Sequence, residues 1–217
     1  MRPVMRSDEE PRRGRGESTY SQRLQRLQTA WWKRLLDVQR PYRERLRALE
    51  PGFVLEVGCG IGRNLSHLQG HAVGVDIDRE SVSYVVEVLG LRAFTPDSFA
   101  VSEFGRGCPF DTLLLSHLLE HLDADGAIEL MRDYLPRIKP GGRVIVITPQ
   151  EAGFTSDPTH VRFVDEAAVR TLAAECGLVV EALESFPFPR FVGRFFRYNE
   201  FVCCMRLPSP VPTRRAS

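Results

Sequence analysis

The residues with the clearest chemical potential form a short glycine-rich segment. Gly58, Gly60 and Gly62 stand at alternate positions after an apolar run, and Glu56 precedes them. Between a strand-like run and a helix-like run, such glycines form a tight turn that brings backbone N–H groups close to a ligand, because no Cβ stands in the way. A carboxylate at the mouth of this turn favours a ligand that carries positive charge.

Two classes of nucleotide ligand bind at a turn of this kind. Dinucleotide-binding enzymes carry G-x-G-x-x-G and seat an anionic pyrophosphate at the helix N-terminus. In this chain Arg63 occupies the position of the third glycine, and the charge of Glu56 opposes a pyrophosphate. S-adenosylmethionine carries a sulfonium and an ammonium but no phosphate, so the sequence favours this cofactor.

Other polar residues follow the next strand-like runs. Asp76 ends one of them, at the edge where open α/β sheets bind ligands, and its carboxylate can accept hydrogen bonds from both ribose hydroxyls. Ile77 can pack against the adenine, and Asp97 or Ser98 can meet the adenine amino group. The alternative roles are structural: Asp76 as an acid at the N-terminus of the next helix, and Asp97 or Ser98 as a helix cap.

The segment His117-Leu-Leu-Glu-His121 matches the H-x-x-E-H signature of inverted zinc proteases. On one helix, the two histidines would share a face and could bind zinc. The segment instead follows directly on a strand-like run, and no third ligand on a companion helix is evident from the sequence. We therefore expect no metal.

The elements that position these residues alternate along the chain. Helix-like runs separate the first five strand-like runs, which indicates crossover connections and a parallel sheet with both faces covered. A helix capped by Asp165 then precedes two strands that no long helix connects, so we expect an antiparallel pair at the sheet edge. The expected strands span 53–57, 72–76, 93–95, 111–116, 143–148, 178–186 and 200–207, and the expected helices span 64–68, 81–89, 98–104, 124–136 and 166–176.

Length and composition narrow the possibilities further. The 217 residues suit one domain with a substantial core, and a net charge of +1 argues against bulk attraction to nucleic acid or membranes. Arginines are concentrated in the first fifty residues. Such a segment is either a solubilising tail followed by a solvated helix face, or a basic arm that binds nucleic acid. Five cysteines without a C-x-x-C pair predict neither a disulfide framework nor a structural zinc site. Without a long apolar run or a signal core, the expected location is cytoplasmic.

The segments 54–64, 74–78, 110–122 and 135–149 resemble the successive motifs of class I S-adenosylmethionine-dependent methyltransferases, most closely the small bacterial branch that modifies small molecules, lipids and quinones. The resemblance implies an α/β fold with a doubly wound, Rossmann-like, seven-stranded sheet in the order 3-2-1-4-5-7-6, whose last strand is antiparallel. We divide the chain into a disordered basic arm (1–18), a helical lid (19–50), the methyltransferase domain (51–207) and a disordered tail (208–217).

The predicted cofactor contacts come from the glycine turn, the ends of the second and fourth strands, and the segment after the third strand. They are Glu56, Gly58, Cys59, Gly60, Asn64, Asp76, Ile77, Asp97, Ser98, Ser116 and His117.

Methyl transfer from a sulfonium mainly requires that the protein hold the acceptor in line, with a base where a proton must leave. His160 is the first candidate base, because its loop follows the fifth strand at the binding edge and imidazole titrates near neutrality. Ordering of that loop through hydrogen bonds is its alternative role. His121 is the second candidate and Tyr20 a distant third, while Trp31 and Trp32 either wall an apolar pocket or belong to the core.

The expected function is methyl transfer to a small, apolar or amphipathic acceptor, with no membrane span, with a nucleic-acid partner disfavoured, and with an undetermined oligomeric state. One alternative is a nucleic-acid methyltransferase, which the Arg-rich N-terminus supports and the absence of an N/D-P-P-Y/F run weakens. The others are a non-catalytic module that binds the cofactor and a nicotinamide oxidoreductase, which Glu56 and Arg63 disfavour. The aromatic residues expected to line or cap the pocket are Phe154, Phe163, Phe186, Phe188, Phe191, Phe195 and Phe196.

Overall fold

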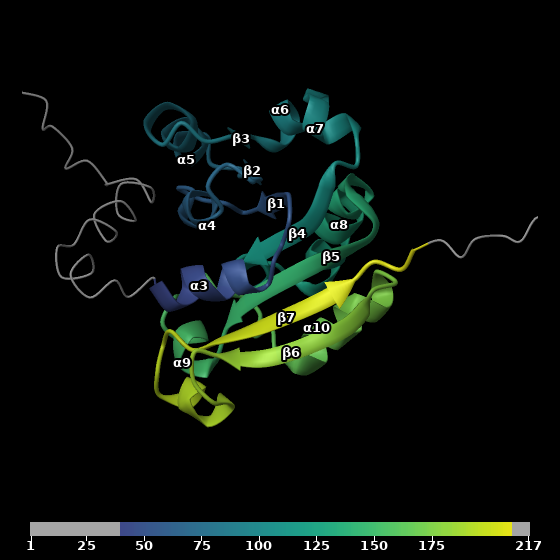
Figure 1. Cartoon of the computed structure of the whole chain (residues 1–217). Coiled ribbons are helices and arrows are strands. Elements are labelled where there is room, and N and C mark those ends of the chain that lie inside the picture. Colours follow the sequence, from purple (N-terminus) through teal and green to yellow (C-terminus); the bar gives the residue numbers. More distant parts are fainter. Residues whose placement is uncertain (1–39, 210–217) are drawn as a thin grey trace, which may run out of the picture.

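The computed structural model describes residues 40–209, and its centre is a seven-stranded sheet (Figure 1). The strand order is β3-β2-β1-β4-β5-β7-β6; β7 runs antiparallel to β5 and β6, while the other neighbouring strands are parallel. The predicted order and the antiparallel last strand are therefore confirmed. The strands span Val54–Val57 (β1), Ala72–Val75 (β2), Ala93–Phe94 (β3), Phe110–Ser116 (β4), Ile138–Pro149 (β5), Val179–Phe186 (β6) and Glu200–Arg206 (β7).

Helices cover both faces of this sheet (Figure 1). Leu46 of α3 and Leu65 of α4 belong to the apolar cluster on one face, whereas Met131 of α8 and Leu172 of α10 belong to the cluster on the other. The α-helices span Arg40–Ala48 (α3), Arg63–His67 (α4), Arg79–Ser83 (α5), Pro96–Val101 (α6), Glu103–Arg106 (α7), Ala124–Tyr134 (α8), Glu151–Phe154 (α9) and Glu166–Glu175 (α10). A π-helix spans Tyr84–Val88 (η1), and 3-10 helices span Leu119–His121 (η2), Leu135–Arg137 (η3) and Arg190–Arg194 (η4).

Strand β1 shows the alternation of a strand that is buried on both faces. Leu55 packs into the cluster with α8 and α10, and Val54 packs into the cluster with α3 and α4. Glu56 shares the face of Val54 and is only 2% exposed. Gly74 of β2 lies directly opposite Glu56, and a Cβ at Gly74 would lie 2.6 Å from Sγ of Cys59. The missing side chain therefore lets the glycine turn pack closely against β2.

Side-chain caps set several helix boundaries. The Asp165 carboxylate accepts a hydrogen bond from the backbone of Ala168 and caps α10, as predicted. The run expected to form one helix over 98–104 forms two, because Thr95 caps α6 and Ser102 caps α7. The single-helix prediction is thus wrong at this point: a serine inside the run starts a second helix.

Other elements differ from prediction mainly in their ends. The helix expected over 81–89 begins earlier, because Asp78 caps α5, and it continues as the π-helix η1. Strand β5 begins at Ile138, which pairs with Phe110 ahead of the main ladder. The short elements η2, α9 and η4 were not predicted, since segments of three to five residues carry too little periodicity.

Part of the predicted organisation lies outside the described residues. This holds for the basic arm, for the lid up to residue 39 with Tyr20, Trp31 and Trp32, and for the tail from residue 210. Helix α3, which contains Pro41, covers the end of the predicted lid. The domain boundaries remain predictions. Within residues 40–209, no helix combines the length and apolar character needed to cross a bilayer.

Candidate active site

The glycine turn links β1 to α4, and its three glycines all have positive φ, a conformation that residues with a Cβ rarely adopt. A Cβ at Gly62 would lie 2.8 Å from a methyl group of Val85, and one at Gly58 would lie 3.0 Å from Leu118. A Cβ at Gly60 would meet no atom within 4 Å. Gly58 and Gly62 therefore allow close packing, whereas Gly60 faces open space.

The Glu56 carboxylate is buried beside this turn. Its Oε1 accepts a hydrogen bond of 2.7 Å from Nδ2 of Asn64, whereas Oε2 has no hydrogen-bond partner among the described residues. Burial raises the pKa of Glu56 from 4.5 to about 8, against the hydrogen bond from Asn64 and the charge of Arg63, which lower it. An unpartnered buried carboxylate is costly, so this oxygen is a favourable place for a cationic group.

Asp76 faces the turn from the end of the neighbouring strand. Its Oδ2 accepts a 2.6 Å hydrogen bond from the backbone N–H of Gly60, and its Oδ1 accepts one of 2.9 Å from the N–H of Asp78. Asp78 rather than Asp76 caps α5. Because a carboxylate oxygen can accept two hydrogen bonds, Asp76 holds the turn in place and keeps capacity for a ligand.

A cavity of about 380 Å³ opens between the glycine turn, α3 and the start of β7. It unites residues from distant parts of the chain, and both candidate bases line it. The predicted site residues that line this cavity are Glu56, Gly58, Cys59, Gly60, Asn64, Ser116, His117, His121 and His160. Four predicted cofactor residues are not part of its lining, namely Asp76, Ile77, Asp97 and Ser98.

The residues predicted to meet the adenine lie on the open surface. Ile77 is 86% exposed, and Asp97 and Ser98 are exposed in the first turn of α6. Thr95 is the cap of that helix, so the alternative capping role of Asp97 or Ser98 is wrong. The hydroxyl of Ser98 donates a 3.0 Å hydrogen bond to the carbonyl of Thr95, whereas the Asp97 carboxylate faces solvent.

His117 comes directly after β4 and adopts a left-handed conformation with φ of 54°. Its Nε2 lies 2.9 Å from Oε1 of Glu200, and its Nδ1 lies 3.3 Å from Oε1 of Glu120. Partial burial would lower the pKa of His117, but the two carboxylates raise it from 6.5 to about 10. His117 is therefore a cation at neutral pH that connects β7 with the H-x-x-E-H segment.

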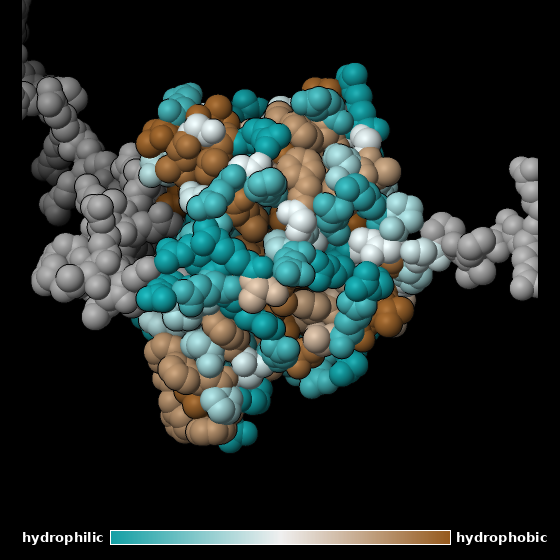
Figure 2. Space-filling model, viewed as in Figure 1, coloured by the Kyte–Doolittle hydropathy of each residue, from teal (hydrophilic) through white to brown (hydrophobic). Residues whose placement is uncertain are grey.

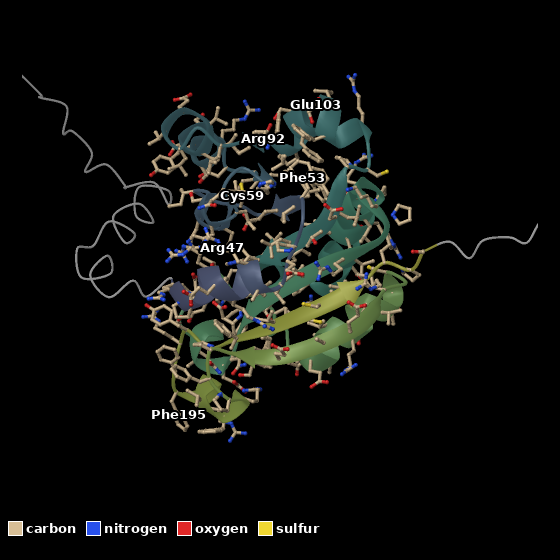
Figure 3. All side chains as sticks on the ribbon, in the orientation of Figure 1. Arg47, Phe53, Cys59, Arg92, Glu103 and Phe195 are labelled. Carbon is tan, nitrogen blue, oxygen red and sulfur yellow. The ribbon has the colours of Figure 1, made fainter. Side chains whose placement is uncertain are left out.

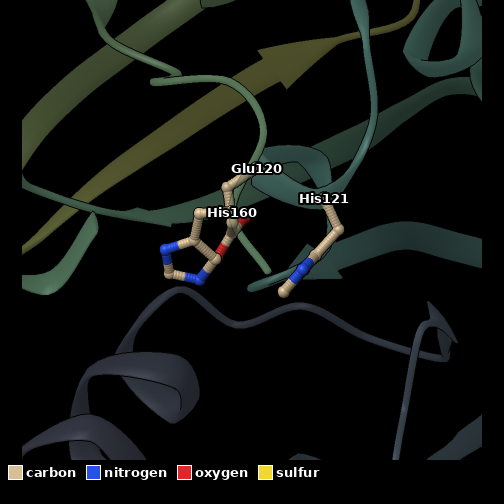
Figure 4. Close-up of side chains that lie close together, drawn as sticks. All are labelled: Glu120, His121 and His160. Atoms are coloured by element: carbon tan, nitrogen blue, oxygen red, sulfur yellow. The ribbon is translucent and has the colours of Figure 1, made fainter. Parts of the chain in front are cut away.

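The structure brings His160 to the H-x-x-E-H segment, as Figure 4 shows. The ring centroids of His121 and His160 are 4.8 Å apart, and Nε2 of His160 lies 4.0 Å from Oε1 of the buried Glu120. Nδ1 of His160 lies 2.8 Å from the carbonyl oxygen of Phe154, to which it donates. His160 thus orders its loop and also lines the cavity, while its role as a base stays a prediction.

Sequence reasoning assigned no role to Tyr42 or Glu200, which also line the cavity. The hydroxyl of Tyr42 donates a 2.6 Å hydrogen bond to the carbonyl of Tyr198, and its ring meets the edge of Phe186. Nothing in the sequence pattern indicates this contact between remote segments. The sequence could have revealed Glu200, because the antiparallel strand predicted to begin at this residue starts at the binding edge of the sheet.

The phenylalanines that were expected to line or cap the pocket do not all lie near it. Phe186 lines the cavity, and Phe154 stacks on His160 with ring centroids 5.4 Å apart. Phe188, Phe191 and Phe195 are exposed instead. Figure 2 shows an apolar patch at the η4 end of the molecule, and Figure 3 shows Phe195 at its outer edge. The prediction is wrong for these three residues, because η4 turns their segment outward.

Comparison with known protein families identifies this architecture. Residues 31–183 match the model of a family described as a methyltransferase domain. The chain belongs to this methyltransferase family. Its reaction is therefore methyl transfer, and its cofactor is S-adenosylmethionine.

Solved structures place the methyltransferase among related folds. A SAM-dependent methyltransferase from Archaeoglobus fulgidus is 18% identical with a TM-score of 0.59, over 82% of this chain and 100% of that chain. A TehB-like SAM-dependent methyltransferase from Corynebacterium glutamicum is 18% identical with a TM-score of 0.59, over 87% and 98%. Magnesium protoporphyrin IX methyltransferase from Synechocystis PCC 6803, with bound SAM, is 17% identical with a TM-score of 0.52, over 89% and 86%. A search of curated protein sequences gave no match.

The raised pKa of Glu56 predicts how the stability of the ligand-free methyltransferase depends on pH. Between its ordinary pKa of 4.5 and its folded pKa of about 8, the folded state holds a proton that the unfolded state has lost. The free energy of unfolding should therefore fall as the pH rises through this range, by at most about 1.4 kcal/mol per pH unit. Urea unfolding at pH 5 to 8 measures this slope.

Glu56→Gln should make the slope shallower, because the amide does not titrate. Glu129→Gln, which makes the same change at an exposed position of α8, should keep the wild-type slope. Equal slopes for wild type and Glu56→Gln would show that Glu56 does not hold its proton in the folded state.

Proposed function

We propose that the cavity holds S-adenosylmethionine against the glycine turn, with Glu56 facing the ammonium group of the cofactor. The observation that carries this proposal is the unpartnered Oε2 of Glu56, buried beside a turn whose Gly60 faces open space. A cation at Oε2 would replace the water that the carboxylate lost on folding. Residues and cofactor therefore fit in charge as well as in shape.

Asp76 is the proposed ribose contact. Both of its oxygens already accept a backbone N–H, which fixes the carboxylate plane and leaves acceptor capacity for two hydroxyls. Ile77 and Asp97 lie exposed beyond it and are the proposed adenine contacts, because the Ser98 hydroxyl is already engaged. We place Ser116 and His117 at the opposite side of the cofactor, where β4 ends.

The bound cofactor supplies a methyl group on a positively charged sulfur, which leaves as a neutral thioether. The protein has to exclude water, orient the acceptor and receive a proton where the acceptor carries one. Nδ1 of His160 donates to a backbone carbonyl, so Nε2 carries the lone pair and is directed toward Glu120. We therefore assign acceptor activation to the side of the cavity formed by Glu120, His121 and His160.

The acceptor that we propose is small and apolar or amphipathic. The remaining cavity lining combines apolar side chains with charged ones, among them Arg45, Asp157 and Arg197, which suits an amphipathic molecule. Magnesium protoporphyrin IX methyltransferase, a neighbour in fold, is named for a small-molecule substrate. The apolar and aromatic lining residues include Leu46, Leu49, Ile147, Phe186 and Tyr198.

Asp76→Asn should weaken cofactor binding, because the amide keeps the shape but loses the charge and one acceptor. Loss of a charge-assisted hydrogen bond of about 1.5–3 kcal/mol corresponds to a dissociation constant roughly 10- to 100-fold higher. Titration calorimetry with S-adenosylmethionine measures the change. Asp133→Asn, an exposed aspartate of α8, should bind like wild type. Unchanged affinity of Asp76→Asn would remove Asp76 from the site.

The acceptor class predicts where a labelled methyl group goes. Incubated with methyl-labelled cofactor and a mixed extract of small molecules, lipids, RNA and protein, the enzyme should label the fraction that contains small apolar or amphipathic compounds. His160→Ala should still bind the cofactor but lose most of this labelling. Label confined to RNA or protein would contradict the proposed acceptor, and full labelling by His160→Ala would leave that histidine with its structural role alone.

A further inference from the structure

Three side chains that could bind a metal meet at one wall of the cavity (Figure 4). One donor atom from each of Glu120, His121 and His160 can be chosen so that all three lie within 4.8 Å of one another. The two histidines line the cavity, whereas Glu120 is completely buried. The buried carboxylate and the two partly buried imidazoles form a candidate cation site that opens toward the cavity.

The hydrogen bonds of both histidines leave the same ring nitrogen available. Nδ1 of His160 lies 2.8 Å from the carbonyl oxygen of Phe154, and Nδ1 of His121 lies 3.2 Å from that of Thr159. A carbonyl can only accept, so Nδ1 carries the proton in each ring and Nε2 carries the lone pair. Histidines that bind metals characteristically donate their second nitrogen to a carbonyl or carboxylate in this way.

Glu120 lacks the hydrogen bonds that a buried carboxylate requires. Neither oxygen has a hydrogen-bond partner among the described residues. His117 approaches Oε1 at 3.3 Å, but its other nitrogen lies 2.9 Å from Glu200, so one imidazole stands between two carboxylates. Removing a carboxylate from water without adequate compensation costs several kcal/mol, which a bound cation would offset.

The backbone holds the three ligands in place before any ion binds. The N–H groups of Val161 and Arg162 donate to the carbonyl oxygen of Glu120, with distances of 2.8 and 3.2 Å. These bonds join the loop that carries His160 to the segment that carries Glu120 and His121. The third ligand comes from this loop rather than from a companion helix, which is why the sequence did not reveal it.

We propose that Glu120, His121 and His160 form a binding site for one divalent transition-metal ion, with zinc as the representative. Two imidazoles and one carboxylate are a recurrent ligand set for zinc and ferrous iron, whereas magnesium and calcium prefer oxygen ligands. The three residues leave coordination positions open toward the cavity. This assignment replaces the expectation of no metal.

The open positions suggest what the ion would do, and this step rests on the proposed function. An acceptor whose hydroxyl binds the ion would release its proton to solvent in the open cavity more readily, because a divalent cation stabilises the alkoxide or phenolate. That oxygen would then take the methyl group, and the sulfonium would leave as a neutral thioether. His160 would then be a ligand rather than a free base. The favoured acceptors would carry an oxygen that can bind the ion, on an otherwise apolar body.

The test uses the full chain with any affinity tag removed, stripped with EDTA and dialysed. Zinc alone is titrated in competition with a chromophoric chelator, and thermal unfolding is followed with and without zinc. We expect one zinc per chain with submicromolar affinity, a higher unfolding temperature with zinc, and no comparable effect of magnesium. Glu120→Gln and His160→Gln should each weaken zinc binding at least tenfold, and His71→Gln, an exposed histidine outside the cluster, should not.

Glu120→Gln also provides a check on folding. In EDTA it should stay folded, because the amide keeps the shape of the side chain and Glu200 still pairs with His117; if it does not fold, His121→Ala takes its place in the titration. Substoichiometric zinc, or equal affinity in the variants, would overturn the site. Cofactor binding in EDTA separates the two proposals: binding of S-adenosylmethionine without zinc binding refutes the metal site alone, and failure to bind the cofactor refutes the proposed function.

Discussion

A buried carboxylate in an otherwise apolar strand is the constraint around which this site is built. Glu56 is buried in β1, and within the described part of the chain its carboxyl group has one hydrogen-bond partner, Asn64. An ionised carboxylate cannot stay there without a counter-charge, so the ligand-free protein keeps it protonated near neutral pH. Gly74 lets the glycine turn pack closely against β2, whereas Gly60 faces open space on the side from which a ligand can approach. In the proposed complex, the cofactor supplies a positive charge beside Glu56.

The cavity has a second side with the same character. Glu120 is also buried, neither of its oxygens has a hydrogen bond within residues 40–209, and it lies beside the imidazoles of His121 and His160. His117 lies between the sides, held by Glu120 and Glu200. One side is suited to the ammonium of a cofactor and the other to an ion or an acceptor proton. On each side, a buried carboxyl group with too few hydrogen bonds among the described residues favours a cationic ligand over water.

The sequence predicts best the features that depend on residues close together along the chain. The glycine turn and the Asp165 cap depend on periodicity and on neighbours within a few residues, and both were correct. The strand order was also correct, but it was implied by the resemblance to class I methyltransferases and not by local pattern. The meeting of His160 with Glu120 depends on backbone bonds between a loop and a turn forty residues earlier, which no local pattern encodes. The outward course of η4 was equally hidden, so exposed phenylalanines were taken for pocket residues.

The central claim, that a protonated Glu56 becomes the counter-ion of a cationic cofactor, has a direct measurement. The heat of S-adenosylmethionine binding at pH 7 is compared in phosphate and Tris buffers, whose ionisation enthalpies differ. Because the ligand-free pKa is about 8, binding should release about one proton from wild type and almost none from Glu56→Gln. Equal heats in the two buffers for the wild-type enzyme would contradict the account, since Glu56 would then keep its proton beside the bound cofactor.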